Sequence, residues 1–356
     1  MRRPNERTAV ILGLLIVFIL WSSGPWLGIG AYVAKVKQER MGEAKTALGG
    51  EKPEKRGMTE DELRERIRQE AASRYVAPVD ARIDRVWKAI PGYNGLEVDE
   101  ARTLKLALAH KTGPQDPLPF VYNEREPKIQ LSDLPAEPVY KGNPNKPMAA
   151  LMINVAWGEE YLPDMLNTLL NENVHATFFF DGSWLSKHVE LAKQIGSYGH
   201  ELSNHAYSHP DMSKLSRSLA ESQIVKTQAL LQEKLGVRNT LFAPPSGDFD
   251  AETVQIAHEQ GLTTVLWTLD TVDWKNPPPS AILRRIAPRL EPGSLILMHP
   301  TASTRDALPE LIRAIKQKGL ALGTVSELLS SKRLPSLEWK GNLPLADAES
   351  FLTGPR

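Results

Sequence analysis

A regular alternation of apolar and amphipathic segments between residues 149 and 318 constrains the fold of this chain most strongly. Short apolar runs are separated by longer segments in which apolar residues recur at helical spacing. The strand-like runs are Ala149–Val155, Ala176–Phe180, Glu201–Ser203, Thr240–Phe242, Thr263–Trp267 and Ser294–Met298. The helix-like segments are Leu162–Glu172, Val189–Tyr198, Leu215–Leu235, Ala251–Glu259, Ser280–Leu290 and Asp306–Lys318. Strands that alternate with helices pair in parallel through crossover connections, so the pattern predicts an α/β barrel.

Histidines are concentrated at one point of this pattern. Three of the eight histidines, His200, His205 and His209, fall within ten residues. His205 and His209 are four residues apart, and on one helical turn or in a tight loop both imidazoles can point the same way. Two neutral imidazoles supply half of a zinc-type site, which still needs a carboxylate and a water. The alternative is that these histidines only cap or hydrogen-bond to loops.

Further short motifs follow the predicted strands in a fixed order. They are Asn154-Val155-Ala156-Trp157-Gly158, Ala243-Pro244-Pro245-Ser246-Gly247, Asp270-Thr271-Val272-Asp273-Trp274 and Leu297-Met298-His299. Together with the histidine pair, this ordered set resembles the polysaccharide deacetylase family (NodB homology, carbohydrate esterase family 4) over residues 148–334. The resemblance implies a distorted (β/α)7 barrel, with its site at the carboxyl ends of the strands.

The resemblance also implies a role for each matching residue. His205 and His209 correspond to ligands of Zn²⁺ or another divalent metal. His299 corresponds to the catalytic acid that protonates the leaving amine, and Asp273 to the residue that holds it. The implied reaction removes N-acetyl groups from a cell-wall glycan, of the peptidoglycan or chitin type. The residues expected to contact that glycan are Trp274, Tyr207, Leu297 and Pro245.

Three positions depart from the family pattern. Ala156 stands where the family has its general base, Trp157 where it has a carboxylate ligand, and Ala243 where an arginine orients the base. An alanine cannot accept a proton and a tryptophan cannot ligate a metal. Loss of a general base costs about 10²–10⁴ in rate. The sequence therefore leaves two functions open: a slow deacetylase, and a catalytically inactive glycan-binding or scaffold pseudoenzyme.

Two further alternatives concern residues near the motifs. Glu159 or Glu160 could serve as the base of a different metal hydrolase, and either of them or Asp181 could replace the missing ligand. Asp273 and His299 could instead form only a buried polar pair that stabilises the barrel mouth.

The N-terminal sequence predicts a membrane anchor. Arg2, Arg3 and Arg7 precede a long apolar segment, residues 8–33, which is either an uncleaved transmembrane anchor or a cleaved signal peptide. Both alternatives place the remainder outside the cytoplasm, either as a single-pass membrane protein or as a secreted one. Anchored members of the resembled family with degenerate motifs suggest an association with sporulation.

The remaining segments are predicted from composition. Residues 34–77 read as a charged stalk, in which Thr59-Glu60-Asp61-Glu62 forms a capping box for a solvated helix to Arg74. Residues 78–147 read as a small membrane-proximal unit, and residues 335–356 as a loosely packed tail. The expected elements of the unit at residues 78–147 are a helix at Ala81–Ala89, a strand at Leu96–Val98 and a helix at Glu100–His110.

Overall charge and cysteine content exclude several partners and chemistries. Basic and acidic residues number 43 each, which argues against nucleic acid as a partner. The chain has no cysteine, which excludes disulfides, thiolate zinc sites and thiol nucleophiles.

Overall fold

The computed structural model describes residues 57–334. The predicted anchor or signal peptide (8–33), the first part of the predicted stalk and the predicted tail (335–356) lie outside the described residues. Within residues 57–334, no helix has the length and apolar character needed to cross a bilayer. Residues 57–58 and 110–116 belong to one compact unit, in which the Met58 N–H donates to the Thr112 carbonyl (2.9 Å). All other described residues belong to the second unit, to which the following paragraphs refer.

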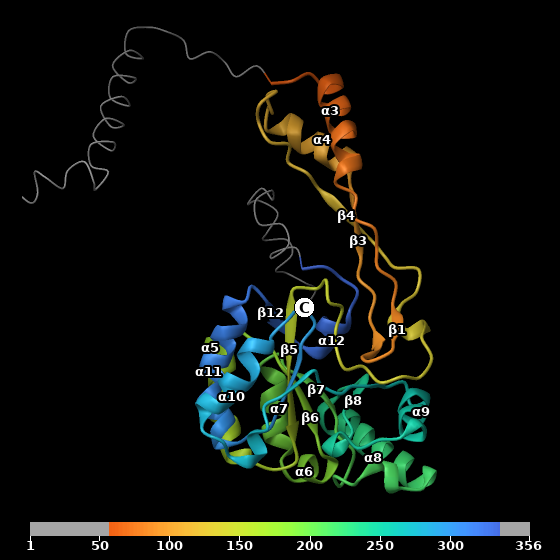
Figure 1. The fold of residues 1–356 in the computed structure, drawn as a ribbon, viewed down its shortest axis with the longest axis vertical. Helices are drawn as coiled ribbons and strands as arrows, with labels where there is room; N and C mark the ends of the chain where they lie inside the picture. Colours follow the sequence, from red (N-terminus) through yellow and green to blue (C-terminus); the bar gives the residue numbers. More distant parts are fainter. Residues whose placement is uncertain (1–56, 335–356) are drawn as a thin grey trace, which may run out of the picture. The chain divides into compact units, whose positions relative to one another are not determined.

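A curled parallel sheet organises the second unit (Figure 1). The strand order is β10-β11-β5-β6-β7-β8-β9, and β12 pairs with the beginning of β5. The strands are β5 (Met148–Val155), β6 (Thr177–Phe180), β7 (Glu201–Asn204), β8 (Leu241–Phe242), β9 (Thr263–Thr264), β10 (Leu269–Asp270), β11 (Leu295–Met298) and β12 (Ala321–Gly323). The predicted α/β class with parallel pairing is confirmed, although β10 and β12 were not expected.

Strand β5 lies at the centre of the sheet, and all eight of its residues are buried. Leu151 and Ile153 pack into the cluster shared with the outer helices, whereas Ala150 and Met152 pack into the cluster enclosed by the sheet. Successive side chains of a strand point to opposite faces. A continuous apolar run is therefore what a parallel strand covered on both sides requires.

Helices cover the outer face of the sheet. Figure 1 shows α5, α10 and α11 together on one side, with α8 and α9 beside the strands β7 and β8. The helices are α5 (Leu162–Asn171), α6 (Gly182–Lys187), α7 (Val189–Ser197), α8 (Arg217–Leu235), α9 (Ala251–Glu259), α10 (Pro279–Ile286), α11 (Ala302–Gln317) and α12 (Val325–Leu329). All six predicted helices are present, and α6 and α12 were not expected.

The sheet does not close between β9 and β10, and a segment preceding β5 occupies part of that opening. The Val139 N–H donates to the Thr264 carbonyl (2.9 Å), and the Leu266 N–H donates to the Val139 carbonyl (2.8 Å). The Thr268 hydroxyl donates to the Tyr140 carbonyl (2.7 Å). Val139 is fully buried, so the segment before the barrel contributes to the barrel's own core.

The chain before residue 139 forms helices and two-stranded sheets. Its elements are α3 (Glu60–Ser73), β1 (Arg82–Asp84), β2 (Lys88–Ile90), β3 (Gly95–Val98), α4 (Glu100–Ala109) and β4 (Tyr122–Arg125). The Thr59–Glu62 capping box is confirmed. The prediction of a fully solvated helix is wrong in one respect, because Leu63 and Ile67 are buried where α3 packs against α4.

The helix predicted at Ala81–Ala89 is wrong, because this segment is the β1–β2 hairpin. Its turn is stabilised by one Asp84 carboxylate oxygen, which accepts hydrogen bonds from the N–H groups of Val86 and Trp87 (2.8 Å each). Aspartate favours such turns because its side chain bonds to backbone groups two or three residues ahead.

Stability is expected to fall on acidification because His200 is buried without charge. It lies at the start of β7, where Nδ1 accepts from the Ala176 N–H (3.2 Å), and Nε2 has no partner among residues 57–334. Burial, and secondarily His175, lowers the pKa of His200 to about 4. Below about pH 6.5 the unfolded chain therefore binds a proton at His200 that the folded chain does not. The free energy of unfolding falls as a result, by up to about 1.4 kcal/mol per pH unit. The free energy of unfolding, measured with urea between pH 7.5 and 4.5, should decline less steeply in a His200→Leu variant than in the native chain. An equal decline in both would contradict this explanation.

Candidate functional site

A cavity of about 430 Å³ opens at the carboxyl ends of the sheet strands. Its walls come from segments that follow β5, β7, β8, β10 and β11. The lining residues are Asn154, Ala156, Trp157, His205, His209, Ser246, Trp267, Asp270, Trp274, Leu297 and His299. Seven of the site residues predicted from sequence are in this set. They meet at the carboxyl ends of the strands, which is the location that the sequence predicted.

His205 is held as a neutral imidazole. It is 1% exposed, and its Nδ1 donates to the Ala243 carbonyl at 2.7 Å. Burial, followed by the neighbouring His209, lowers the pKa of His205 to about 3. The Nδ1 hydrogen bond leaves Nε2 as a lone-pair acceptor, an arrangement typical of metal-binding histidines and also compatible with a purely structural one.

His209 completes the histidine pair. Its ring lies edge-on to that of His205, with centroids 5.2 Å apart. The pair comes together because Ala206 and His209 adopt left-handed backbone conformations (φ 59° and 55°), which bend the loop after β7 back on itself. Such conformations are uncommon for residues other than glycine and recur at functional sites.

The residues present do not fit a zinc site of the family type. Such a site needs three protein ligands in addition to water. Between residues 57 and 334, no group of three or more histidine and carboxylate side chains is placed to hold a metal ion. Beside the two imidazoles, the position of the expected carboxylate is occupied by the Trp157 indole, which has no ligating atom.

Trp157 lies across the mouth of the cavity. Its indole is 43% exposed and stacks on the His299 imidazole, with ring centroids 5.9 Å apart and planes 9° apart. The following Gly158 adopts a left-handed conformation (φ 84°), and a Cβ there would lie 2.0 Å from the Pro300 carbonyl oxygen. This close approach brings the end of β5 against the segment after β11, which sets Trp157 over His299.

Asp273 and His299 form the predicted pair. One Asp273 oxygen accepts from His299 Nδ1 (2.8 Å), and the other accepts from the His299 backbone N–H (2.6 Å) and from the Thr304 hydroxyl. Asp273 is fully buried, while His299 faces the cavity. The contact is therefore confirmed, and it leaves His299 Nε2 as the ring nitrogen available to a ligand.

Three other sequence-predicted residues do not line the cavity. Tyr207 packs against Gly182, and Pro245 is buried in a short 3-10 turn. Ala243 contributes its carbonyl to His205 instead of its side chain. The prediction that Tyr207 and Pro245 contact a glycan gains no support from the cavity.

The carboxylates considered as substitutes also lie outside the lining residues. Glu159 accepts a hydrogen bond from the Trp184 indole N–H (3.3 Å), and Asp181 caps helix α6 by accepting from the Trp184 backbone N–H (2.9 Å). Glu160 is not a lining residue either. Glu159 and one oxygen of Asp181 are held by local contacts, and the other Asp181 oxygen is buried without a partner among residues 57–334. None of the three carboxylates lines the cavity, which disfavours a hydrolase built on them.

Four more residues line the cavity: Asn154, Ser246 and Asp270, which were assigned no role from sequence, and Trp267, which was considered only as an aromatic residue that could stack on a glycan. Asn154 is 3% exposed, and its side-chain oxygen has no hydrogen-bond partner within the described ranges. A buried acceptor without a partner beside a cavity is suited to a ligand or an ordered water. All four lie within or next to the motifs, so their position could have indicated them.

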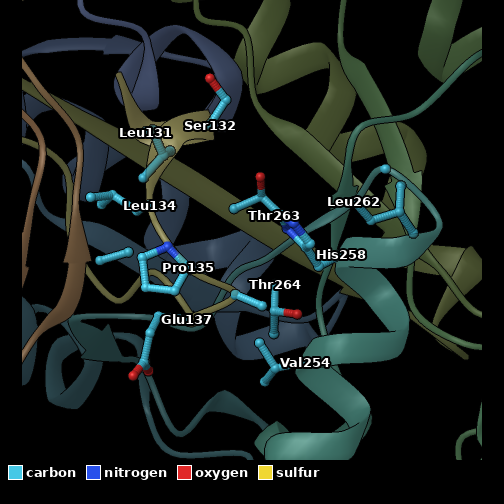
Figure 2. Close-up of a pocket in the computed structure, with 13 residues that line it drawn as sticks. Leu131, Ser132, Leu134, Pro135, Glu137, Val254, His258, Leu262, Thr263 and Thr264 are labelled. Atoms are coloured by element: carbon cyan, nitrogen blue, oxygen red, sulfur yellow. The ribbon is translucent and has the colours of Figure 1, made fainter. Parts of the chain in front are cut away.

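A second cavity, of about 210 Å³, lies between the segment 131–137 and the helix α9 with strand β9 (Figure 2). Figure 2 shows Pro135, His258, Thr263 and Thr264 around it. The Thr264 hydroxyl is buried and has no partner among the residues described. None of the sequence-predicted site residues lines this cavity, so it is separate from the candidate site.

Comparison with known proteins identifies the family. A family model for polysaccharide deacetylase matches residues 141–265. A peptidoglycan-N-acetylglucosamine deacetylase of Bacillus cereus is 32% identical over 199 residues, which cover 54% of this chain and 72% of that protein. This chain belongs to the polysaccharide deacetylase family.

Two relatives that match more of the chain are an uncharacterized protein and a protein described as a pseudoenzyme. The uncharacterized protein YlxY of Bacillus subtilis (strain 168) is 47% identical over 276 residues, covering 78% of this chain and 86% of that protein. BA3943 of Bacillus anthracis, described as a CE4 family pseudoenzyme, matches with a TM-score of 0.71 and 41% identity over 76% of this chain and 96% of its own. A BA3943 mutant described as having restored enzymatic activity matches with a TM-score of 0.71 and 40% identity, over 76% of this chain and 99% of its own.

Proposed function

We propose that this polysaccharide deacetylase family member is a pseudoenzyme that binds an N-acetylated cell-wall glycan without deacetylating it. The proposal rests mainly on the presence of Ala156 and Trp157 in the cavity, where the family pattern has a base and a carboxylate ligand. No proton acceptor stands at the base position, and the Trp157 indole lies beside His299 at the expected position of the carboxylate ligand. The similarity to the pseudoenzyme BA3943 supports the same conclusion.

The cavity retains features suited to a sugar. Trp157 and Trp274 both line it and are 43% and 51% exposed. Exposed indole faces are uncommon on protein surfaces without a ligand, because they leave a large apolar area in water. Sugar rings present flat apolar faces to aromatic side chains and hydroxyl groups to polar ones. The Asn154 amide oxygen and the His299 imidazole offer such polar partners.

The alternative, a slow deacetylase, has less support. It requires a metal at His205 and His209 that no carboxylate helps to hold, and a water without a neighbouring base. His299 lines the cavity and is held by the buried Asp273, so acid catalysis is the one catalytic feature that this alternative keeps.

We further propose that the glycan is peptidoglycan, that the domain is anchored outside the cytoplasm and that its fold is the barrel of this family. The relatives named for their action on peptidoglycan N-acetylglucosamine favour peptidoglycan as the glycan. The apolar segment at residues 8–33 favours an extracytoplasmic, membrane-anchored domain. The curled sheet would be the distorted (β/α)7 barrel of this family, and a role in sporulation remains a proposal from resemblance.

The proposal is tested by measuring binding and acetate release together. The native chain should bind an N-acetylglucosamine tetramer and purified peptidoglycan while releasing no acetate from either. Trp274→Ala should weaken tetramer binding by about tenfold, because it removes one stacking face. Tyr75→Ala, an exposed aromatic (54%) that does not line the cavity, is the matched control. Acetate release at a rate typical of an enzyme, or unchanged binding in Trp274→Ala, would contradict the proposal.

A further inference from the structure

A further pocket, of about 540 Å³ and distinct from the two cavities described above, adjoins the segment that follows β10 and is lined by basic side chains; it is called the basic pocket below. Four cationic side chains line it: Lys275, Arg284, Arg285 and Arg289. All four are exposed, and none has a carboxylate within 4.0 Å among the residues that the structure describes. The pocket therefore concentrates positive charge that no described acidic side chain neutralises.

Within residues 57–334, some basic side chains on the same unit pair with carboxylates and others, such as Lys234 and Lys318, do not, so what distinguishes the four cations is that they line one pocket. Arg217 pairs with Glu252 and Glu259, and Lys316 pairs with Glu172. In a chain with equal numbers of basic and acidic residues, pairing is readily available. Four cations around one pocket repel one another, so an anionic ligand bound between them would relieve that repulsion.

The helix macrodipole accounts for only part of the cluster. Arg284 and Arg285 occupy the last turn of α10, where cations interact favourably with the helix carbonyl end. Lys275 lies in a separate 3-10 turn after β10, and Arg289 in another after α10. Arg289 Nε donates to the Arg285 carbonyl at the end of α10 (2.8 Å), so only Lys275 approaches the pocket independently of that helix.

The basic pocket and the candidate site share a wall. Asp270 and Trp274 line the first cavity, whereas Thr271, Val272 and Lys275 line the basic pocket. The Lys275 ammonium lies 4.8 Å from the centroid of the Trp274 ring. A single short segment therefore presents an indole to one cavity and a cation to the other.

That segment is held in an unusual backbone conformation. Val272 has φ 55°, a left-handed value that is rare for a β-branched residue, and Asn276 has φ 49°. The Asp270 carboxylate accepts from the Val272 N–H (2.8 Å), and the Ser303 hydroxyl donates to the Pro277 carbonyl (2.6 Å). Backbone strain that neighbouring contacts maintain is found where a loop serves a binding site.

We propose that the basic pocket binds carboxylate groups carried as substituents by the glycan whose sugar chain occupies the neighbouring cavity. This inference rests on the proposed glycan binding and deepens it: the ligand is an acidic, peptide-substituted glycan and not a neutral N-acetylglucosamine polymer. The planar guanidinium groups of the three arginines match carboxylates through paired N–H donors, which gives charge-assisted hydrogen bonds.

The test compares three probes on the full chain. They are a peptidoglycan-derived tetrasaccharide with peptide carboxylates, the same compound with those carboxylates amidated, and a neutral N-acetylglucosamine tetramer. The native chain should bind the carboxylate form about tenfold more tightly than the amidated form. This preference should shrink as salt is added, because salt screens exposed charges.

Variants separate the pocket from total charge. Arg284→Gln/Arg285→Gln should abolish the preference for carboxylates while leaving binding of the neutral tetramer unchanged. Lys234→Gln/Lys318→Gln is the matched control, since it also removes two exposed charges from helix carboxyl ends but away from the pocket. Matched urea midpoints would confirm that both variants fold.

Each outcome decides between the two proposals. Equal binding of the carboxylate and amidated forms by the native chain would overturn the basic-pocket inference and leave glycan binding intact. The same holds if the arginine variant keeps its full preference. Failure of the native chain to bind any of the three probes would overturn the proposed function, and this inference with it.

Discussion

Replacing Trp157 by aspartate is expected to convert the histidine pair into a zinc site. His205 and His209 already lie side by side as ring neighbours, with centroids 5.2 Å apart, and burial keeps His205 neutral. The missing element is a third protein ligand, and a carboxylate at position 157 would supply it. Zinc retained after dialysis should rise from near zero in the native chain to about one ion per chain in Trp157→Asp.

Adding Ala156→Asp to this variant is expected to restore acetate release. The second aspartate supplies the proton acceptor, whose contribution is typically about 10²–10⁴ in rate. Ala156→Asp alone should bind no more zinc than the native chain, because it leaves the Trp157 indole in place.

A control separates the added carboxylate from the removed indole. Trp157→Leu removes the indole without supplying a ligand, so it should retain no zinc. If Trp157→Leu and Trp157→Asp retained equal amounts of zinc, the steric effect of the indole, and not the missing carboxylate, would be what prevents metal binding.

Asp273→Asn is expected to destabilise the fold by about 3 kcal/mol, whatever the catalytic state of the protein. The carboxylate accepts from three donors: the His299 N–H, His299 Nδ1 and the Thr304 hydroxyl. An amide has one acceptor oxygen, so its NH₂ group would face at least one of these donors. Asp273 is fully buried, so water cannot replace the lost bond.

Urea unfolding measures this effect, and Thr304→Val is its graded control. The valine removes one donor while the carboxylate keeps its two bonds to His299, so the expected loss is only about 1 kcal/mol. A change below about 0.5 kcal/mol in Asp273→Asn, which is within the range of ordinary surface substitutions, would show that the pair contributes little to stability.

The family and the altered site were predictable from sequence because both depend on local patterns. The alternation of apolar runs with helical segments predicts parallel strands, and β5, β6 and β11 lie where the runs do. The replacement of two carboxylates by Ala156 and Trp157 is visible in the motif itself. Parallel strand ends meet at one edge of the sheet, so the gathering of His205 and His299 follows from the order of the motifs.

Local patterns were insufficient where distant segments compete for the chain. The segment Ala81–Ala89 has helix-like spacing, yet it forms a hairpin because Asp84 stabilises its turn and the Ala89 N–H bonds to the Pro138 carbonyl (3.1 Å). Val139 likewise reads as part of a proline-rich loop, but it fills the opening between β9 and β10.

The sequence by itself thus indicated the fold class and the family and predicted a site at the strand ends, since each of these is written in residue type and spacing. Tertiary structure alone decided that Trp157 stacks on His299 and that Asp273 is bound by three donors. It also decided that four cations from three separate elements surround one pocket. These features depend on contacts between residues far apart in the chain, which no local periodicity encodes.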